Sequence, residues 1–105
     1  MTGSLNFLEP WKEERSDIYT NELYKELSIS HILKDEKISI VARRIDCDEF
    51  LFKLLNKHEK YAQVHLTWNG KPEQNVKWPR TKIYDSLEDW VSTRMIIDNN
   101  EYEIE

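Results

Sequence analysis

The chain has 105 residues, 39% of them hydrophobic and 33% charged, with a formal net charge of −5. This length allows one domain with its own core, and the negative charge argues against a sequence-independent nucleic-acid surface, which needs clustered lysine and arginine. Cys47, the single cysteine, excludes an intramolecular disulfide. No apolar run approaches the ~20 residues of a membrane span and no signal peptide is recognisable, so we expect a cytoplasmic protein without membrane association.

Residues 1–9 are expected to form a loose N-terminus, followed by a helix from Pro10 to about Leu27. Proline is favoured at the first position of a helix, and the acidic Glu13 and Glu14 suit its first turn. Apolar residues then recur at helical spacing, which predicts one buried stripe made of Trp11, Ile18, Tyr19, Leu23 and Leu27.

Four strands are predicted next, at 38–45, 50–55, 61–68 and 81–84. The 50–55 run fits a strand or a helix by itself, and its flanking turns favour a strand. The 61–68 strand is the clearest, because its residues alternate strictly between apolar and mixed polar. Short connections make the sheet antiparallel. The loop at 69–80 is polar and contains Gly70, Pro72 and Pro79.

A second amphipathic helix is predicted after Ser86, a favourable N-cap, and residues 98–105 are expected to form an acidic tail. Residues 10–97 therefore read as a single α+β domain of order α-β-β-β-β-α, with a four-stranded antiparallel sheet and both helices packed on one face. The predicted core consists of Trp11, Ile18, Leu23, Leu66, Trp68, Leu87, Trp90 and Val91.

Several short motifs resemble those of a family of small bacterial proteins to which no activity is attached. The segments are Ala42–Phe52 (ARRIDCDEFLF), the VHLTWNGKPE run from Val64, the WPRT run from Trp78, and the helix containing Trp90. The resemblance covers roughly residues 11–95. It implies a bacterial, cytosolic protein and transfers no function.

The polar side of the 61–68 strand is the first candidate surface. If the helices cover Ala62, Val64 and Leu66, alternation places the other residues on the open face: Tyr61, Gln63, His65 and Thr67. A face evolved only for solvent would carry more charge, so we predict that His65 lies at or beside a functional surface. The alternative, a hydrogen-bonded histidine on a half-covered sheet, stays open.

Arg43 and Arg44 end the first predicted strand, and one should project to each face. A guanidinium pair could bind phosphate or carboxylate, or could instead pair with Asp46 and Asp48 inside the hairpin. Trp78 could line a ligand site or anchor the 69–80 loop in the core.

The favoured functional hypothesis is a non-catalytic module that binds a protein partner, or its own copy in a homo-oligomer, through the open face and the 69–80 loop. The alternative is a small enzyme or small-molecule binder with Arg43 or Arg44 and His65 around an anionic ligand. A deep pocket on that face would favour the second, and a flat apolar patch the first. No residue is assigned a catalytic or metal-binding role, and no cofactor is expected.

Overall fold

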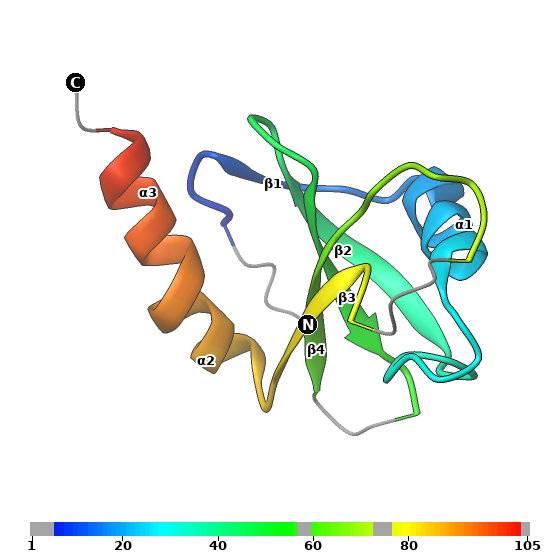
Figure 1. Cartoon of the computed structure of the whole chain (residues 1–105). Coiled ribbons are helices and arrows are strands. Elements are labelled where there is room, and N and C mark those ends of the chain that lie inside the picture. The colour runs from blue at the N-terminus through cyan, green and yellow to red at the C-terminus, as the bar shows by residue number, and fades with distance from the viewer. Residues whose placement is uncertain (1–5, 57–59, 73–76, 104–105) are drawn as a thin grey trace.

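Five antiparallel strands form one sheet, in the order in which they follow one another along the chain (Figure 1). This computed structural model describes residues 6–56, 60–72 and 77–103. Its elements are β1 (Trp11–Glu13), α1 (Asp17–Glu26), β2 (Ile38–Arg44), β3 (Glu49–Leu54), β4 (Tyr61–His65), β5 (Arg80–Tyr84), α2 (Leu87–Trp90), the π-helical turn η1 (Val91–Met95) and α3 (Ile96–Tyr102). The α+β class and the antiparallel sheet are confirmed, but the prediction of four strands is wrong.

The fifth strand is β1, which occupies the start of the predicted first helix. Trp11 pairs with Arg44, so this short segment extends the sheet beyond β2. The helix begins only at Asp17, where the Ser16 hydroxyl accepts a hydrogen bond from the Ile18 amide at 3.3 Å. Ile18 lies in the first turn of this helix and is 61% exposed, which contradicts its predicted place in the core.

The helices lie on opposite faces of the sheet, so the prediction that both pack on one face is wrong (Figure 1). Leu23 of α1 packs with Phe50 and Phe52, whereas Trp90 of α2 packs with Leu51, the residue between them. Successive side chains of a strand point to opposite faces. An unbroken apolar run in β3 is therefore the pattern of a strand covered on both sides.

Two buried glutamates of α1 end the alternation of β4 earlier than predicted. The Glu26 carboxylate accepts hydrogen bonds from the backbone amides of Thr67 at 3.0 Å and Trp68 at 2.7 Å, and Glu22 accepts one from Gly70 at 3.0 Å. Trp68 adopts a positive φ of 59° and is 43% exposed, so it does not join the core. Burial, followed by the hydrogen bond with Glu22, raises the pKa of Glu26 from 4.5 to about 7.

The C-terminal helical segment is longer and better anchored than the predicted tail. Ser86 caps it, as predicted, by accepting a hydrogen bond from the Asp89 amide at 3.0 Å. Helix α3 then continues through Tyr102, and Asp98 is 3% exposed because its carboxylate pairs with groups from the sheet. Within the described residues, no helix is long and apolar enough to span a membrane.

Candidate functional site

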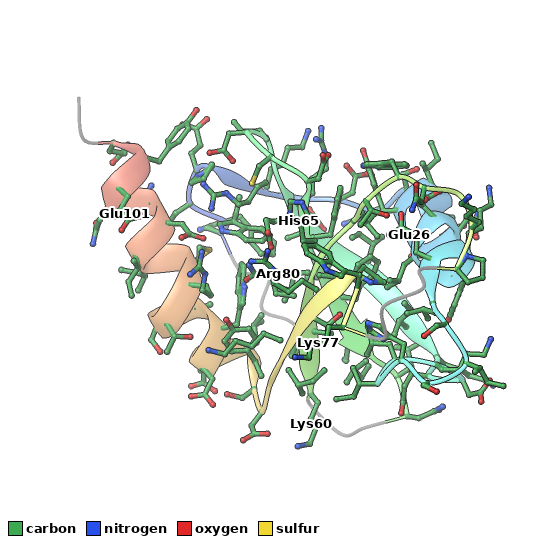
Figure 2. The ribbon with its side chains drawn as sticks, viewed as in Figure 1. Glu26, Lys60, His65, Lys77, Arg80 and Glu101 are labelled. Atoms are coloured by element: carbon green, nitrogen blue, oxygen red, sulfur yellow. The ribbon has the colours of Figure 1, made fainter. Side chains whose placement is uncertain are left out.

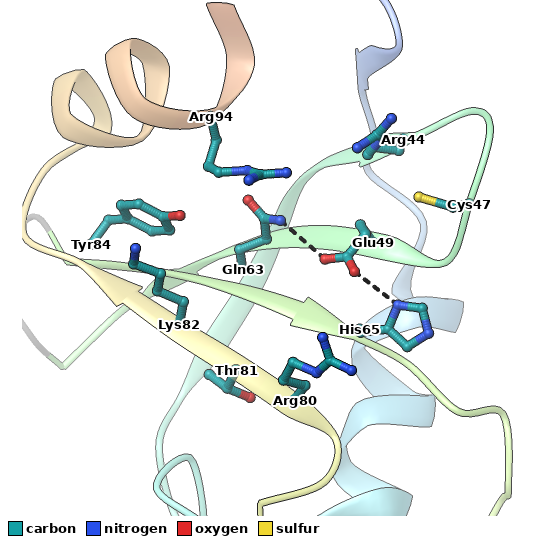
Figure 3. Close-up of a pocket in the computed structure, with 10 residues that line it drawn as sticks. All are labelled: Arg44, Cys47, Glu49, Gln63, His65, Arg80, Thr81, Lys82, Tyr84 and Arg94. Atoms are coloured by element: carbon teal, nitrogen blue, oxygen red, sulfur yellow. Dashed lines mark hydrogen bonds and ion pairs between the residues drawn. The ribbon is translucent and has the colours of Figure 1, made fainter. Parts of the chain in front are cut away.

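A hollow of about 330 Å³ opens on the sheet face that α2 and η1 partly cover (Figure 3). Its walls come from the ends of β2 and β3, from β4 and β5, and from η1. The lining residues are Arg44, Cys47, Glu49, Gln63, His65, Arg80, Thr81, Lys82, Tyr84 and Arg94. This face is the one on which the sequence places Gln63 and His65.

Four of the lining side chains are cationic, and they come from three different elements. Arg44 ends β2, Arg80 and Lys82 lie on β5, and Arg94 lies on η1. The register of β4 and β5 sets Lys82 opposite Gln63 and Arg80 opposite His65, so both cations face the hollow beside the polar residues of β4. Among the described residues, neither Arg80 nor Lys82 has an acidic partner at salt-bridge distance.

The two arginines at the opposite side of the hollow share one buried carboxylate, that of Asp98. Arg44 also pairs with Asp46 through two hydrogen bonds of 2.9 and 2.8 Å, which is the pairing inside the hairpin that the sequence left open. Asp98 bonds the Nη2 atom of Arg94 at 2.9 Å, lies 3.5 Å from Nη1 of Arg44, and accepts a hydrogen bond from the indole of Trp11 at 2.9 Å. The Nε atom of Arg94 is buried and has no partner within the described structure. A buried polar atom of this kind is normally satisfied by water or a ligand.

The wider turn of η1 places Arg94 at this wall. The hydroxyls of Ser92 and Thr93 both donate to the Asp89 carbonyl, which offers the backbone an alternative to regular α-helical bonding. Single π-helical turns of this kind occur often at functional sites. Burial raises the pKa of Tyr84 on the same wall.

A hydrogen-bonded series crosses the floor of the hollow from Trp90 to His65. The Trp90 indole donates to Oε1 of Gln63 at 2.9 Å, and Nε2 of Gln63 donates to Oε1 of Glu49 at 3.0 Å. The second oxygen of Glu49 lies 2.8 Å from Nδ1 of His65 (Figure 3). His65 is half-buried, and its side chain has 38% of its surface exposed. The series fixes the orientation of the imidazole.

Trp78 closes the edge of the hollow near His65. The Arg80 guanidinium lies over its ring at 4.9 Å from the centroid, and the His65 ring meets it edge to face at 6.4 Å. Figure 2 shows His65 and Arg80 close together, with Glu26 on the α1 side. Trp78 therefore orients Arg80, which has no acidic partner in the described ranges, through a cation–π contact.

The hollow gathers only some of the residues that the sequence singles out. Arg44, Gln63 and His65 line it, and Trp78 borders it. Arg43 points to the α1 face, where it pairs with Glu14 at 2.9 Å. One arginine thus projects to each face, as predicted. The ligand and partner roles of these residues stay predictions.

Two further candidates lie outside the hollow. Tyr61 is at the far end of β4 and packs against the core around Trp90, and Thr67 follows the end of β4 and bonds Glu26 through its amide. Of the predicted 69–80 loop, residues 73–76 lie outside the described structure.

Sequence reasoning missed the cations of β5 and the carboxylate of Glu49. Arg80, Lys82 and Tyr84 alternate with a period of two, and this signal was available in the sequence. Their contact with His65 depends on the register of β4 against β5, which the sequence does not specify. Glu49 appears in the sequence analysis only within the ARRIDCDEFLF motif and is assigned no role there.

Cys47 lines the hollow, but its environment opposes thiolate chemistry. Burial and the nearby Asp46 and Glu49 carboxylates raise the pKa of its thiol, although Arg44 acts in the opposite direction. Within the described part of the chain, no three His, Cys, Asp or Glu side chains are grouped closely enough to hold a metal ion.

Comparison of the chain with models of protein families, with curated proteins and with solved structures finds no match. The geometry of the hollow is therefore the basis for the functional argument.

Proposed function

We propose that the protein binds a small anionic molecule in this hollow, with a phosphate ester as the best-suited class. The observation that carries the proposal is the convergence of Arg44, Arg80, Lys82 and Arg94 on one cavity, in a chain whose net charge is −5. Glu49, the one acidic lining residue, has both of its oxygens engaged by neighbours. A dianion would balance the charges of Arg80 and Lys82, which have no acidic partner among the described residues, whereas Arg44 and Arg94 already pair with acidic side chains.

The unpaired donors support a phosphate in particular. Arg80 and Lys82 lack acidic partners among the described residues, and Nε of Arg94 is unbonded. Guanidinium groups bind phosphate and carboxylate through paired, charge-assisted hydrogen bonds, and lysine adds a compact charge. The volume of about 330 Å³ lies within the range of small-molecule sites.

This proposal takes up the alternative drawn from the sequence, with Arg44 rather than Arg43 beside His65. The favoured sequence hypothesis, a protein partner or a second copy on the same face, stays a prediction. A charged hollow supports a ligand, whereas a flat apolar patch would support a partner.

Calorimetric titration of the whole chain tests the proposal with inorganic phosphate, pyrophosphate and citrate. We expect Arg80→Ala and Lys82→Ala each to weaken binding by about tenfold, because each removes a charge-assisted contact. The matched controls are Arg15→Ala and Lys25→Ala, which remove the same charges from exposed positions away from the hollow. Their affinities should stay within about twofold of the wild type.

Two results would contradict the proposal. One is the absence of binding of all three anions at up to about 10 mM. The other is an equal loss of affinity in the control variants, which would indicate a general charge effect rather than a site.

A further inference from the structure

The hydrogen bonds on the floor of the hollow have a fixed direction. The indole N–H of Trp90 can only donate, so the atom of Gln63 that it meets at 2.9 Å must be the carbonyl oxygen. The amide NH₂ of Gln63 must then donate to Glu49 at 3.0 Å. Glu49 accepts this bond with one oxygen and meets Nδ1 of His65 with the other.

This direction determines which nitrogen of His65 carries the ring proton. An ionised carboxylate is only an acceptor, so Nδ1 of His65 donates to Glu49. In the neutral ring, Nε2 is then left with its lone pair. Within the described residues, Nε2 makes no hydrogen bond, and the half-exposed ring lines the hollow. The cavity thus contains an acceptor among many donors.

The charges around Nε2 restrict the donor that it can accept. An ammonium group would be repelled by Arg44, Arg80, Lys82 and Arg94, whereas a hydroxyl is neutral and brings its own proton. His65 and Arg80 are directly opposed on β4 and β5, and side chains at such positions start only ~5 Å apart. If the anionic group of a ligand binds Arg80, a hydroxyl a few bonds away in the same ligand therefore lies within reach of His65.

We propose that the hollow selects hydroxylated phosphate esters, with His65 Nε2 accepting a hydrogen bond from a hydroxyl close to the phosphate. This inference rests on the proposed function, because the phosphate is held by the cationic residues. His65 acts here as a specificity residue, and Trp90, Gln63 and Glu49 are positioning residues that fix its tautomer.

A pair of ligands with equal charge and similar size tests the inference. Glycerol 3-phosphate and propyl phosphate differ in two hydroxyls, and both are titrated calorimetrically at about pH 8.5, which is about two units above the ordinary histidine pKa. One neutral hydrogen bond corresponds to a roughly fivefold preference, so the wild type should bind glycerol 3-phosphate about fivefold more tightly. His65→Phe should reduce this preference to within about twofold and still bind propyl phosphate.

Nitrogen-15 spectra of the unsubstituted protein give a measurement that does not depend on a variant folding. His65 should show a protonated Nδ1 and an unprotonated Nε2, and the Nε2 resonance should shift on saturation with glycerol 3-phosphate more than with propyl phosphate. A protonated Nε2 and bare Nδ1 would overturn the inference.

The outcomes separate the two proposals. If both ligands bind wild-type protein equally, and His65→Phe changes neither affinity, the hydroxyl preference is wrong and the anion site stands. If neither ligand binds, the proposed function itself fails, and this inference fails with it.

Discussion

The two faces of the sheet receive alternate residues of the same strands but differ in what covers them. On the α1 face, aliphatic and aromatic side chains form a continuous core between the helix and the sheet. On the other face, Trp11, Trp90 and their neighbours close one part, and the rest opens into the cationic hollow. A small domain can thus use one face mainly for stability and share the other between packing and a site.

Deleting a large side chain from either core should give the largest effects. Trp90→Ala should lower the free energy of unfolding by about 3–5 kcal/mol, and Leu23→Ala on the α1 face by about 2–5 kcal/mol, because both residues are fully buried. Chemical denaturation measures both changes. A change below about 1 kcal/mol for Trp90→Ala would show that α2 does not close its face as described.

The acid pair on the α1 face should make stability depend on pH. Because the pKa of Glu26 is raised from 4.5 to about 7, the folded chain binds a proton more tightly than the unfolded chain. The resulting stabilisation is complete below about pH 4.5 and is lost as the pH rises through about 7. Glu22→Gln supplies a permanent N–H donor to Glu26 and should reduce this loss, although the burial of Glu26, the larger cause of its raised pKa, stays unchanged.

At about pH 8, the Glu22→Gln variant should therefore exceed the wild type in stability by on the order of 1 kcal/mol, the contribution of one hydrogen bond. Urea denaturation across this pH range provides the measurement. Parallel stability curves for the two proteins would show that Glu22 does not contribute to the raised pKa of Glu26. A change in phosphate affinity in the variant would show that the α1 face and the hollow affect one another.

Neighbouring arginines allow the same comparison for binding. Arg44→Gln and Arg43→Gln remove equal charges from adjacent residues that point to opposite faces. Arg44→Gln should weaken phosphate binding by about tenfold, whereas Arg43→Gln should change it by less than about twofold. The reverse order in calorimetric titrations would place the anion on the α1 face.

The smallest effect is expected at Ile18, which helical spacing assigns to the core. Because its side chain is 61% exposed, Ile18→Ala should change the free energy of unfolding by less than about 0.5 kcal/mol. Chemical denaturation of Ile18→Ala and Leu23→Ala under the same conditions measures both changes. A loss of about 2 kcal/mol would restore Ile18 to a buried position.

The elements defined by local patterns were predictable, and those defined by distant partners were not. The alternation in β4 and the cap at Ser86 are properties of neighbouring residues. In contrast, β1 is held by pairing with β2, and Trp11 bonds Asp98, which is 87 residues away. No periodicity within a short window reports such a contact.

The candidate site was predictable to a similar degree. Alternation indicated Gln63 and His65, because their side of β4 follows from the apolar side. Placing Arg80 and Lys82 beside His65 required the register of β4 against β5, and placing Arg94 at the hollow required the π-helical turn η1. Whether the second face of the sheet is covered depends on α1 and α2 packing on opposite faces, and no local pattern in the sequence indicates this.

The register shift in β2 has a consequence for how this site could change over generations. Ile40 pairs with Phe52 but Ala42 pairs with Leu51, so one additional residue, Val41, is accommodated between them. Removing that residue would restore simple alternation and leave Arg43 opposite Phe50 on the α1 face, with Arg44 still directed to the hollow. A single codon deletion at Val41 could therefore remove the bulge without changing which arginine serves the hollow.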